Sequence, residues 1–200
     1  MNKPSLASRL VSAGHALMNV CAVPGRYASW LVMVLIVVVV FMVVGSALGM
    51  SNLASWERSV PLFGNHLNII SLAELQWHLF ALLIMLGGAY ALTEDRHIRV
   101  DILSSRMSSR GNALVDLIGD LVFLLPFYAF VLWFSWDYME RSYLINEQSN
   151  SGGLIDRYLV KAALPLGCVL LIGAGVGRII RSIGILMEPA AAAPAREEVV

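Results

Sequence analysis

Charged side chains are scarce in this chain of 200 residues: they make up 14%, and 14 basic residues balance 14 acidic ones. Without a basic excess the chain cannot neutralise a row of phosphates, so we expect no nucleic-acid partner. Hydrophobic residues reach 58%, which excludes intrinsic disorder for the bulk of the chain. That share also exceeds what a domain of this size can bury. Lipid must therefore cover part of the surface.

Cysteine and catalytic motifs are lacking as well. Cys21 and Cys168 are too few for a disulfide framework, and both are interpreted as small packing residues. The sequence has no glycine-rich phosphate loop, nucleophile elbow or HExxH motif. His78 is the one histidine within a predicted span, whereas haem ligation usually needs a second axial ligand. We therefore expect no enzymatic activity, no cofactor and no metal.

The chain has instead four long apolar segments, and a helix needs about 20 such residues to cross the hydrocarbon core. In the first segment, both the apolar run and the stretch of residues before it are too long for a cleaved signal peptide. Arg178 ends the fourth and is expected to reach the interface. We predict an all-α integral membrane protein whose membrane domain covers residues 27–182. Its four transmembrane helices are expected at about 30–50, 69–92, 114–138 and 159–180.

Segments outside the spans are expected to be simpler. Residues 1–26 should contain a helix, which either lies at the interface or extends the first span and breaks at Pro24-Gly25. Residues 183–200 are predicted to be a flexible tail. The loop 51–68 is expected to form at most one short turn, and the loop 140–158 to be irregular. Five residues give the N-terminal segment an apolar face: Leu6, Leu10, Ala13, Leu17 and Val20.

Lysine and arginine are unevenly divided between the two sides of the membrane, and such residues favour the cytoplasm. With both termini inside, the outer loops hold four of them: Arg58, Arg141, Arg157 and Lys161. The inner segments hold ten: Lys3, Arg9, Arg26, Arg96, Arg99, Arg106, Arg110, Arg178, Arg181 and Arg196. We therefore predict cytoplasmic N- and C-termini.

Few polar residues lie within the spans. Glu74 and His78 share a helix face, as do Asp116 and Asp120. Charges at membrane depth mark a partner, a pore or a relay; the alternative is interfacial carboxylates that are hydrated or paired with arginine. Glu74 is expected near the outer boundary and Asp120 near the inner one, so the two should not form one relay. An inner-loop arginine could pair with Asp116 or Asp120.

Two small-residue patterns predict close helix packing, either within the chain or onto a partner. They are Gly45-xxx-Gly49 and Gly173-xxx-Gly177. The middle of each span is otherwise nearly all apolar, whereas transporters usually carry polar midplane sites. The chain is therefore interpreted as a scaffold subunit of a larger partner. Two other classes compete: a membrane anchor of a respiratory oxidoreductase, against which the lone His78 argues, and a small channel, against which the apolar spans argue.

Three motifs in order resemble one known family. They are Glu74-Leu75-Gln76-Trp77-His78-Leu79-Phe80, then Arg99-Val100-Asp101-Ile102, then Ser151-Gly152-Gly153-Leu154 followed by Lys161 and Leu164-Pro165-Leu166-Gly167. Together they resemble the small, DctQ-like membrane subunit of TRAP (tripartite ATP-independent periplasmic) transporters over about residues 27–182. Tyr158 stands where the family pattern favours Trp.

The resemblance implies a subunit of the bacterial inner membrane that supports a large, many-spanning permease subunit. A periplasmic binding protein would deliver the solute, an organic acid or a related compound, and ion gradients would drive its symport. The small subunit would enlarge the static scaffold and contact the partner or lipid. Candidate residues for such contacts are Glu74, Gln76, Trp77, His78, Arg99, Asp101, Asp120 and Lys161.

Overall fold

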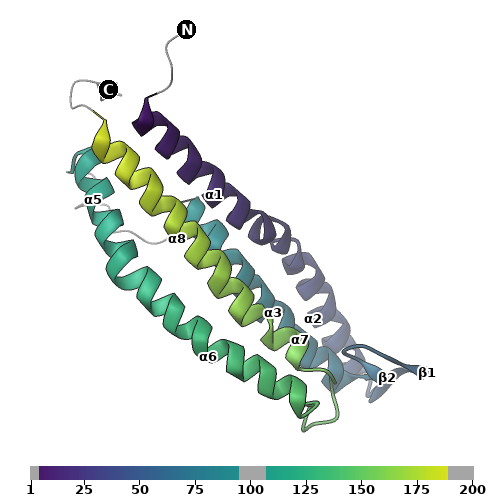
Figure 1. Cartoon of the computed structure of the whole chain (residues 1–200). Helices are drawn as coiled ribbons and strands as arrows, with labels where there is room; N and C mark the ends of the chain where they lie inside the picture. The colour runs from purple at the N-terminus through teal and green to yellow at the C-terminus, as the bar shows by residue number, and fades with distance from the viewer. Residues whose placement is uncertain (1–4, 95–106, 189–200) are drawn as a thin grey trace, which may run out of the picture.

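The structure is a computed structural model that describes residues 5–94 and 107–188 (Figure 1). Four of its helical segments, 6–47, 69–93, 109–144 and 158–187, are long and apolar enough to cross a membrane, which confirms the predicted fold class and its four spans. The elements in chain order are α1 (Leu6–Ala28), α2 (Leu31–Ala47), β1 (Asn52–Val60), β2 (Gly64–Asn68), α3 (Ile69–Thr93), α5 (Ser109–Gly119), the π-helix η1 (Asp120–Leu124), α6 (Leu125–Leu144), α7 (Tyr158–Lys161) and α8 (Ala163–Met187).

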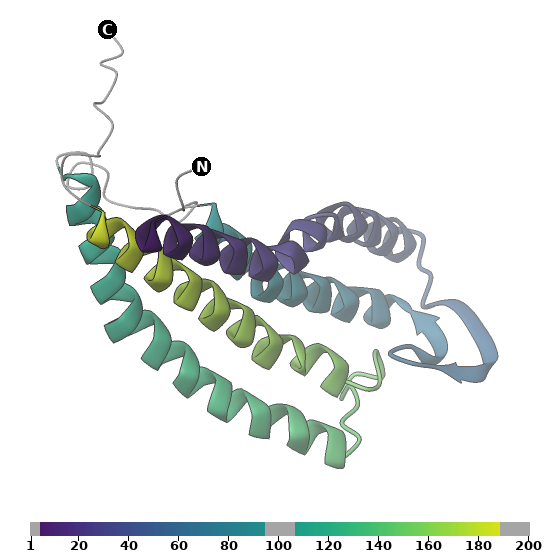
Figure 2. The same ribbon diagram turned by 45° about the horizontal axis from the view of Figure 1, so that its top comes forward.

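The long helices form an open row rather than a closed bundle. α8 packs against α3 on one side and against α5 and α6 on the other, while α2 packs against α3 at the far edge. α1 lies over α3 and α8 (Figure 2). The two edge helices, α2 and α6, therefore each have one main neighbour among the described helices and leave most of their apolar side chains exposed.

The row has two distinct ends. The hairpin end carries β1, β2 and the loop 145–157, and the termini end carries the start of α1 and the end of α8 (Figure 1). Asn68 caps α3 at the hairpin end, since its Oδ1 accepts the backbone N–H of Ser71 at 2.6 Å. Ser108 caps α5 at the termini end in the same way.

α1 packs on the row through its small residues. Gly14 touches α8 so closely that a Cβ there would lie 2.5 Å from the carbonyl oxygen of Gly177. The predicted apolar face is packed only in part: Leu17 contacts a buried cluster, whereas Leu6 and Val20 are exposed. Small residues decide the contact because they let two helix backbones approach. The buried face is Ala7, Gly14, Met18, Cys21, Ala22, Gly25 and Ala28.

The break that one of the two alternatives placed at Pro24-Gly25 does not occur there. α1 runs through Pro24 to Ala28, and the turn that separates it from α2 falls at Ser29 and Trp30. Gly25 is a packing residue, since a Cβ there would lie 2.5 Å from the Leu86 carbonyl oxygen of α3.

The loop 51–68 forms an antiparallel β-hairpin, so the expected single turn was wrong too. Leu62 and Gly64 both adopt positive φ at its tip, and Trp56 Nε1 donates to the Gly64 carbonyl oxygen at 2.6 Å. The sequence lacks the Asn-Gly or Asp-Gly pair that usually announces a tight hairpin. A leucine in the left-handed region is uncommon, which is why the pattern gave no signal.

Candidate functional site

Glu74 holds the loop at the hairpin end. This carboxylate accepts the backbone N–H of Leu154 at 2.9 Å and the hydroxyl of Ser149. Leu154 is fully buried. Two donors on one carboxylate form charge-assisted bonds, which are stronger than neutral ones. We call Glu74, Ser149 and Leu154 the loop clasp; it joins two motifs that lie 80 residues apart in the chain.

Glycine is needed beside the loop clasp. A Cβ on Gly153 would lie 2.6 Å from Glu74 Oε2, so any larger residue would displace the carboxylate. The carbonyl oxygens of Gly152 and Gly153 accept hydrogen bonds from Asn68 Nδ2 at 3.0 Å and Ser71 Oγ at 3.2 Å. The Ser-Gly-Gly-Leu motif therefore lies against the first turns of α3.

The hairpin is attached to the same loop. The backbone N–H of Ile155 donates to the Leu62 carbonyl oxygen at 2.8 Å, and the Ile155 side chain packs at Gly64. A two-stranded hairpin has little stability of its own. These contacts position it on the helices.

Lys161 is paired within the chain. Its Nζ donates to Glu147 Oε2 and lies 3.9 Å from the centre of the Tyr138 ring. Hydrogen bonding from Lys161 is the main cause that lowers the pKa of the Glu147 carboxyl from its ordinary value of 4.5. Lys161 therefore ties α7 to the loop and to α6.

The remaining residues of the first motif point in different directions. Trp77 is exposed, and His78 is buried with Nδ1 2.6 Å from the Glu74 carbonyl oxygen. The Nε2 atom of Gln76 is buried without a hydrogen-bond partner among the described residues. Trp77 is the one exposed side chain of these three. Arg99 and Asp101 lie outside the described residues.

Asp120 forms a buried ion pair with Arg178. The guanidinium Nε lies 2.6 Å from Asp120 Oδ2, and Nη2 contacts the other carboxylate oxygen. The side chains are 1% and 12% exposed. The sequence predicted an inner-loop arginine as the partner of Asp116 or Asp120, and it placed Arg178 at the membrane interface. In the structure Arg178 of α8 is the partner of Asp120. Asp120 opens the π-helix η1, a distortion that is frequent at functional sites.

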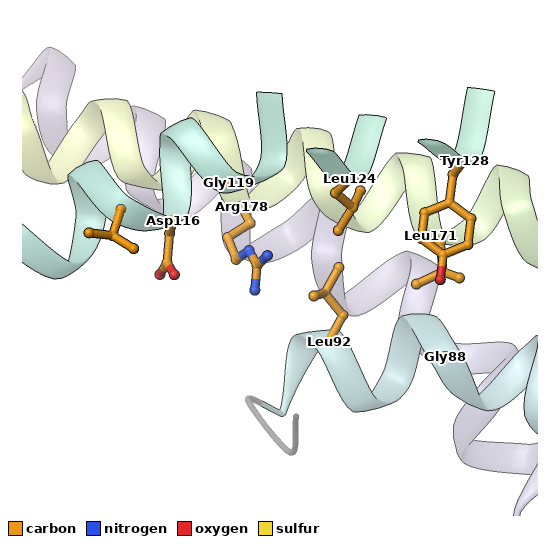
Figure 3. Close-up of a pocket in the computed structure, with 9 residues that line it drawn as sticks. Gly88, Leu92, Asp116, Gly119, Leu124, Tyr128, Leu171 and Arg178 are labelled. Atoms are coloured by element: carbon orange, nitrogen blue, oxygen red, sulfur yellow. The ribbon is translucent and has the colours of Figure 1, made fainter. Parts of the chain in front are cut away.

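A groove of about 420 Å³ lies beside this pair, between α3, α8 and the α5–η1–α6 segment. In Figure 3 the side chains of Asp116 and Arg178 point towards the part of α3 that carries Leu92. The lining of the groove is mainly apolar and consists of Gly88, Leu92, Val115, Asp116, Gly119, Leu124, Tyr128, Leu171 and Arg178. Among residues 5–94 and 107–188, no three His, Cys, Asp or Glu side chains are grouped to hold a metal.

The four predicted packing glycines have different surroundings. Gly173 and Gly177 face α1, where a Cβ would lie 2.7 Å from Cys21 Sγ and 2.8 Å from Met18 Cγ respectively. Gly45 faces Ile69 of α3. Gly49 lies beyond the end of α2 with φ +70° and nothing within 4 Å. It ends the helix as a left-handed glycine, and its predicted packing role stays a prediction.

Sequence reasoning missed Ser149 and Arg178 as partners of Glu74 and Asp120. Ser149 lay in a turn-rich loop, and a hydroxyl there gives no signal of its long-range acceptor. Arg178 could have been found, because an arginine on one span and an aspartate on another are expected to pair within the membrane.

The family comparison agrees with the motifs. The model described as "Tripartite ATP-independent periplasmic transporters, DctQ component" matches residues 62–184, which include the loop clasp, the Asp120–Arg178 pair and the last three spans. No curated protein and no solved structure matches the chain. The match covers more than half of the chain, which therefore belongs to the DctQ family, the small membrane component of TRAP transporters.

Proposed function

We propose that the chain is a static scaffold that holds a large, many-spanning permease subunit during binding-protein-dependent uptake of an organic acid or related solute. The family match over residues 62–184 carries this proposal. The solute would be captured by a periplasmic binding protein, and an ion gradient would drive its entry.

The open row of helices supports a scaffold role. α2 and α6 expose apolar side chains along their length, which gives a partner two edges on which to pack. The half-buried Glu74 and the buried Asp120 are engaged in ties between segments of this chain. They hold the row together rather than line a path for solute.

The orientation follows from the distribution of Lys and Arg. The proposal places the hairpin end in the periplasm and the termini end in the cytoplasm, because the segments at the termini end carry the basic excess. A reporter fused within the hairpin and another fused after residue 188 test this topology: only the second should report a cytoplasmic position.

Co-purification tests the proposed function. The full chain, tagged at its C-terminus and expressed in its native cell, should retain a many-spanning membrane protein in equal amount. Deletion of the gene should abolish uptake of the solute that the associated binding protein captures. A flavoprotein or iron–sulfur partner would instead identify the chain as an oxidoreductase anchor and would overturn the proposal.

A further inference from the structure

A second groove, of about 410 Å³, lies between α6 and α8. It shares no lining residue with the groove beside Asp120 and Arg178. Its lining consists of Ala129, Leu132, Trp133, Trp136, Asp137 and Val169. Apart from the two indole N–H groups, the carboxylate of Asp137 is the one polar side-chain group of this lining. An apolar groove with a few polar groups can fix the orientation of a ligand. We call it the α6–α8 groove.

Asp137 brings a negative charge that the chain does not neutralise by direct contact. Its side chain is exposed, and none of the ion pairs among the described residues includes it. Lys161 is bound to Glu147 instead. Arg141 follows Asp137 by four residues, but the two form no ion pair. A ligand that brings a cation is therefore favoured at this end of the α6–α8 groove.

The carboxylate lies at the level of the bilayer surface. Lys161 and Arg178 are about 25 Å apart along the α7–α8 segment at 1.5 Å per residue, which is close to the thickness of about 30 Å of the hydrocarbon core. The ring of Tyr138 lies 3.9 Å from Lys161 Nζ, and Asp137 precedes Tyr138 directly. Trp136 is next to them, and tryptophan favours the interface between lipid and water. Asp137 therefore faces the headgroup region at the hairpin end.

The α6–α8 groove crosses one leaflet and not the whole membrane. Ala129 and Asp137 are about 12 Å apart along the axis of α6 at 1.5 Å per residue, and one leaflet contributes about 15 Å, half of the hydrocarbon core. A helix of another subunit that crosses the membrane would pack along the full span. An acyl chain that enters from the surface remains in one leaflet. The length of the groove and its single charged end therefore match one lipid molecule.

The carboxylate end selects the chemistry of the headgroup. An ammonium group pairs with Asp137, and it is attracted by the faces of the Trp133 and Trp136 rings, since a cation over an indole is stabilised by the ring electrons. The indole N–H groups can donate to phosphate or ester oxygens of the same lipid. A phospholipid with a phosphate and no amine would bring a negative charge to Asp137 without compensation.

We propose that the α6–α8 groove binds one phospholipid with an ethanolamine headgroup. The ammonium group pairs with Asp137 between the rings of Trp133 and Trp136, and one acyl chain lies along Leu132 towards Ala129. This inference goes beyond the proposed function and does not depend on it, because it needs only that α6 crosses a membrane.

Lipid binding to the full chain tests the headgroup. The protein is purified together with any subunit that stays bound, and native mass spectrometry measures binding of phosphatidylethanolamine and of phosphatidylglycerol with the same acyl chains. The unaltered protein should bind the first lipid at least about tenfold more tightly. Asp137→Asn should remove this preference. Glu140→Gln, the matched control at an exposed position of α6 outside the groove lining, should retain it. Equal affinity for the two lipids in the unaltered protein, or a preference that survives in Asp137→Asn, would overturn the inference.

A second variant tests the part of the α6–α8 groove that takes the acyl chain. Ala129 is exposed, so Ala129→Phe fills the deep end of the groove without disturbing the packed side of α6. It should lower the affinity for both lipids by a similar factor, since the carboxylate is unchanged. Unaltered binding by this variant would show that the acyl chain does not lie in the groove.

Photo-crosslinking in the membrane separates a lipid from a partner helix. A benzoylphenylalanine replaces Leu132 in the full tagged chain expressed in its native cell. Irradiation should give an adduct whose added mass is that of a phosphatidylethanolamine. An adduct with another membrane protein would show that a partner helix fills the α6–α8 groove and would overturn the inference. The co-purification experiment tests the scaffold function separately, so either proposal can fail while the other stands.

Discussion

Asp120 in η1 and Arg178 in α8 meet through two hydrogen bonds between a carboxylate that is 1% exposed and a guanidinium side chain that is 12% exposed. The pair joins the α5–η1–α6 segment to the centre of the row. Because a charge that loses its counter-charge is costly within a membrane, we expect removal of either residue to destabilise the protein.

Asp120→Leu should therefore destabilise the protein by about 3–5 kcal/mol, since it leaves Arg178 buried without its main counter-charge. The double change Asp120→Leu and Arg178→Met should recover most of that loss, because no isolated charge remains. Thermal unfolding in detergent, followed by circular dichroism, measures both. A double variant no more stable than the single one would contradict this account of the pair.

The spans were predictable because membrane thickness fixes their length and because their apolar runs are continuous. The ends of α3 and α5 also follow from local sequence, since Asn68 and Ser108 are standard capping residues. Local signals of this kind reach only a few residues along the chain.

The packing of α1 could not be predicted in the same way. Hydrophobicity selects residues such as Leu6 and Val20, which the structure exposes. The contact depends on small residues. Which of the small residues face a neighbour depends on where α8 lies. The partners of Glu74 and Asp120 are likewise set by the tertiary structure. Leu154 lies 80 residues from Glu74 in the chain, and Arg178 lies 58 residues from Asp120.

Glu74→Gln should loosen the loop at the hairpin end. A glutamine keeps one acceptor oxygen but turns an amide N–H₂ towards the second donor, so about 1–3 kcal/mol of stability should be lost. Cleavage by trypsin after Arg157 should accelerate as the loop detaches. Glu57→Gln on the exposed hairpin is the matched control, and equal cleavage rates in the two variants would refute the clasp.

The pair formed by Glu147 and Lys161 should make stability depend on pH. Because the pKa of Glu147 is lowered in the folded protein, its stabilising contribution is complete above the ordinary value of 4.5 and is lost as the pH falls through the lowered pKa. The unfolding temperatures of the unaltered protein and of Glu147→Gln should therefore differ near neutral pH and converge in acid. A difference in unfolding temperature that stays constant down to pH 3 would show that the Glu147 carboxylate is not the source of the added stability.

Gly177→Ala should destabilise the contact between α1 and α8. The added Cβ would lie 2.8 Å from Met18 Cγ and 2.9 Å from the Gly14 carbonyl oxygen, and such overpacking typically costs about 1–3 kcal/mol. Gly87→Ala is the matched control, since a Cβ at that helical position meets nothing within 4 Å and alanine is about 1 kcal/mol better than glycine in a helix. The two variants should thus shift the unfolding temperature in opposite directions. The backbone of α1 is one side of the contact at Gly177. If Gly177→Ala left the unfolding temperature unchanged, α1 could move away from α8 without loss of stability. The close approach of these two helices would then not be what holds the termini end together.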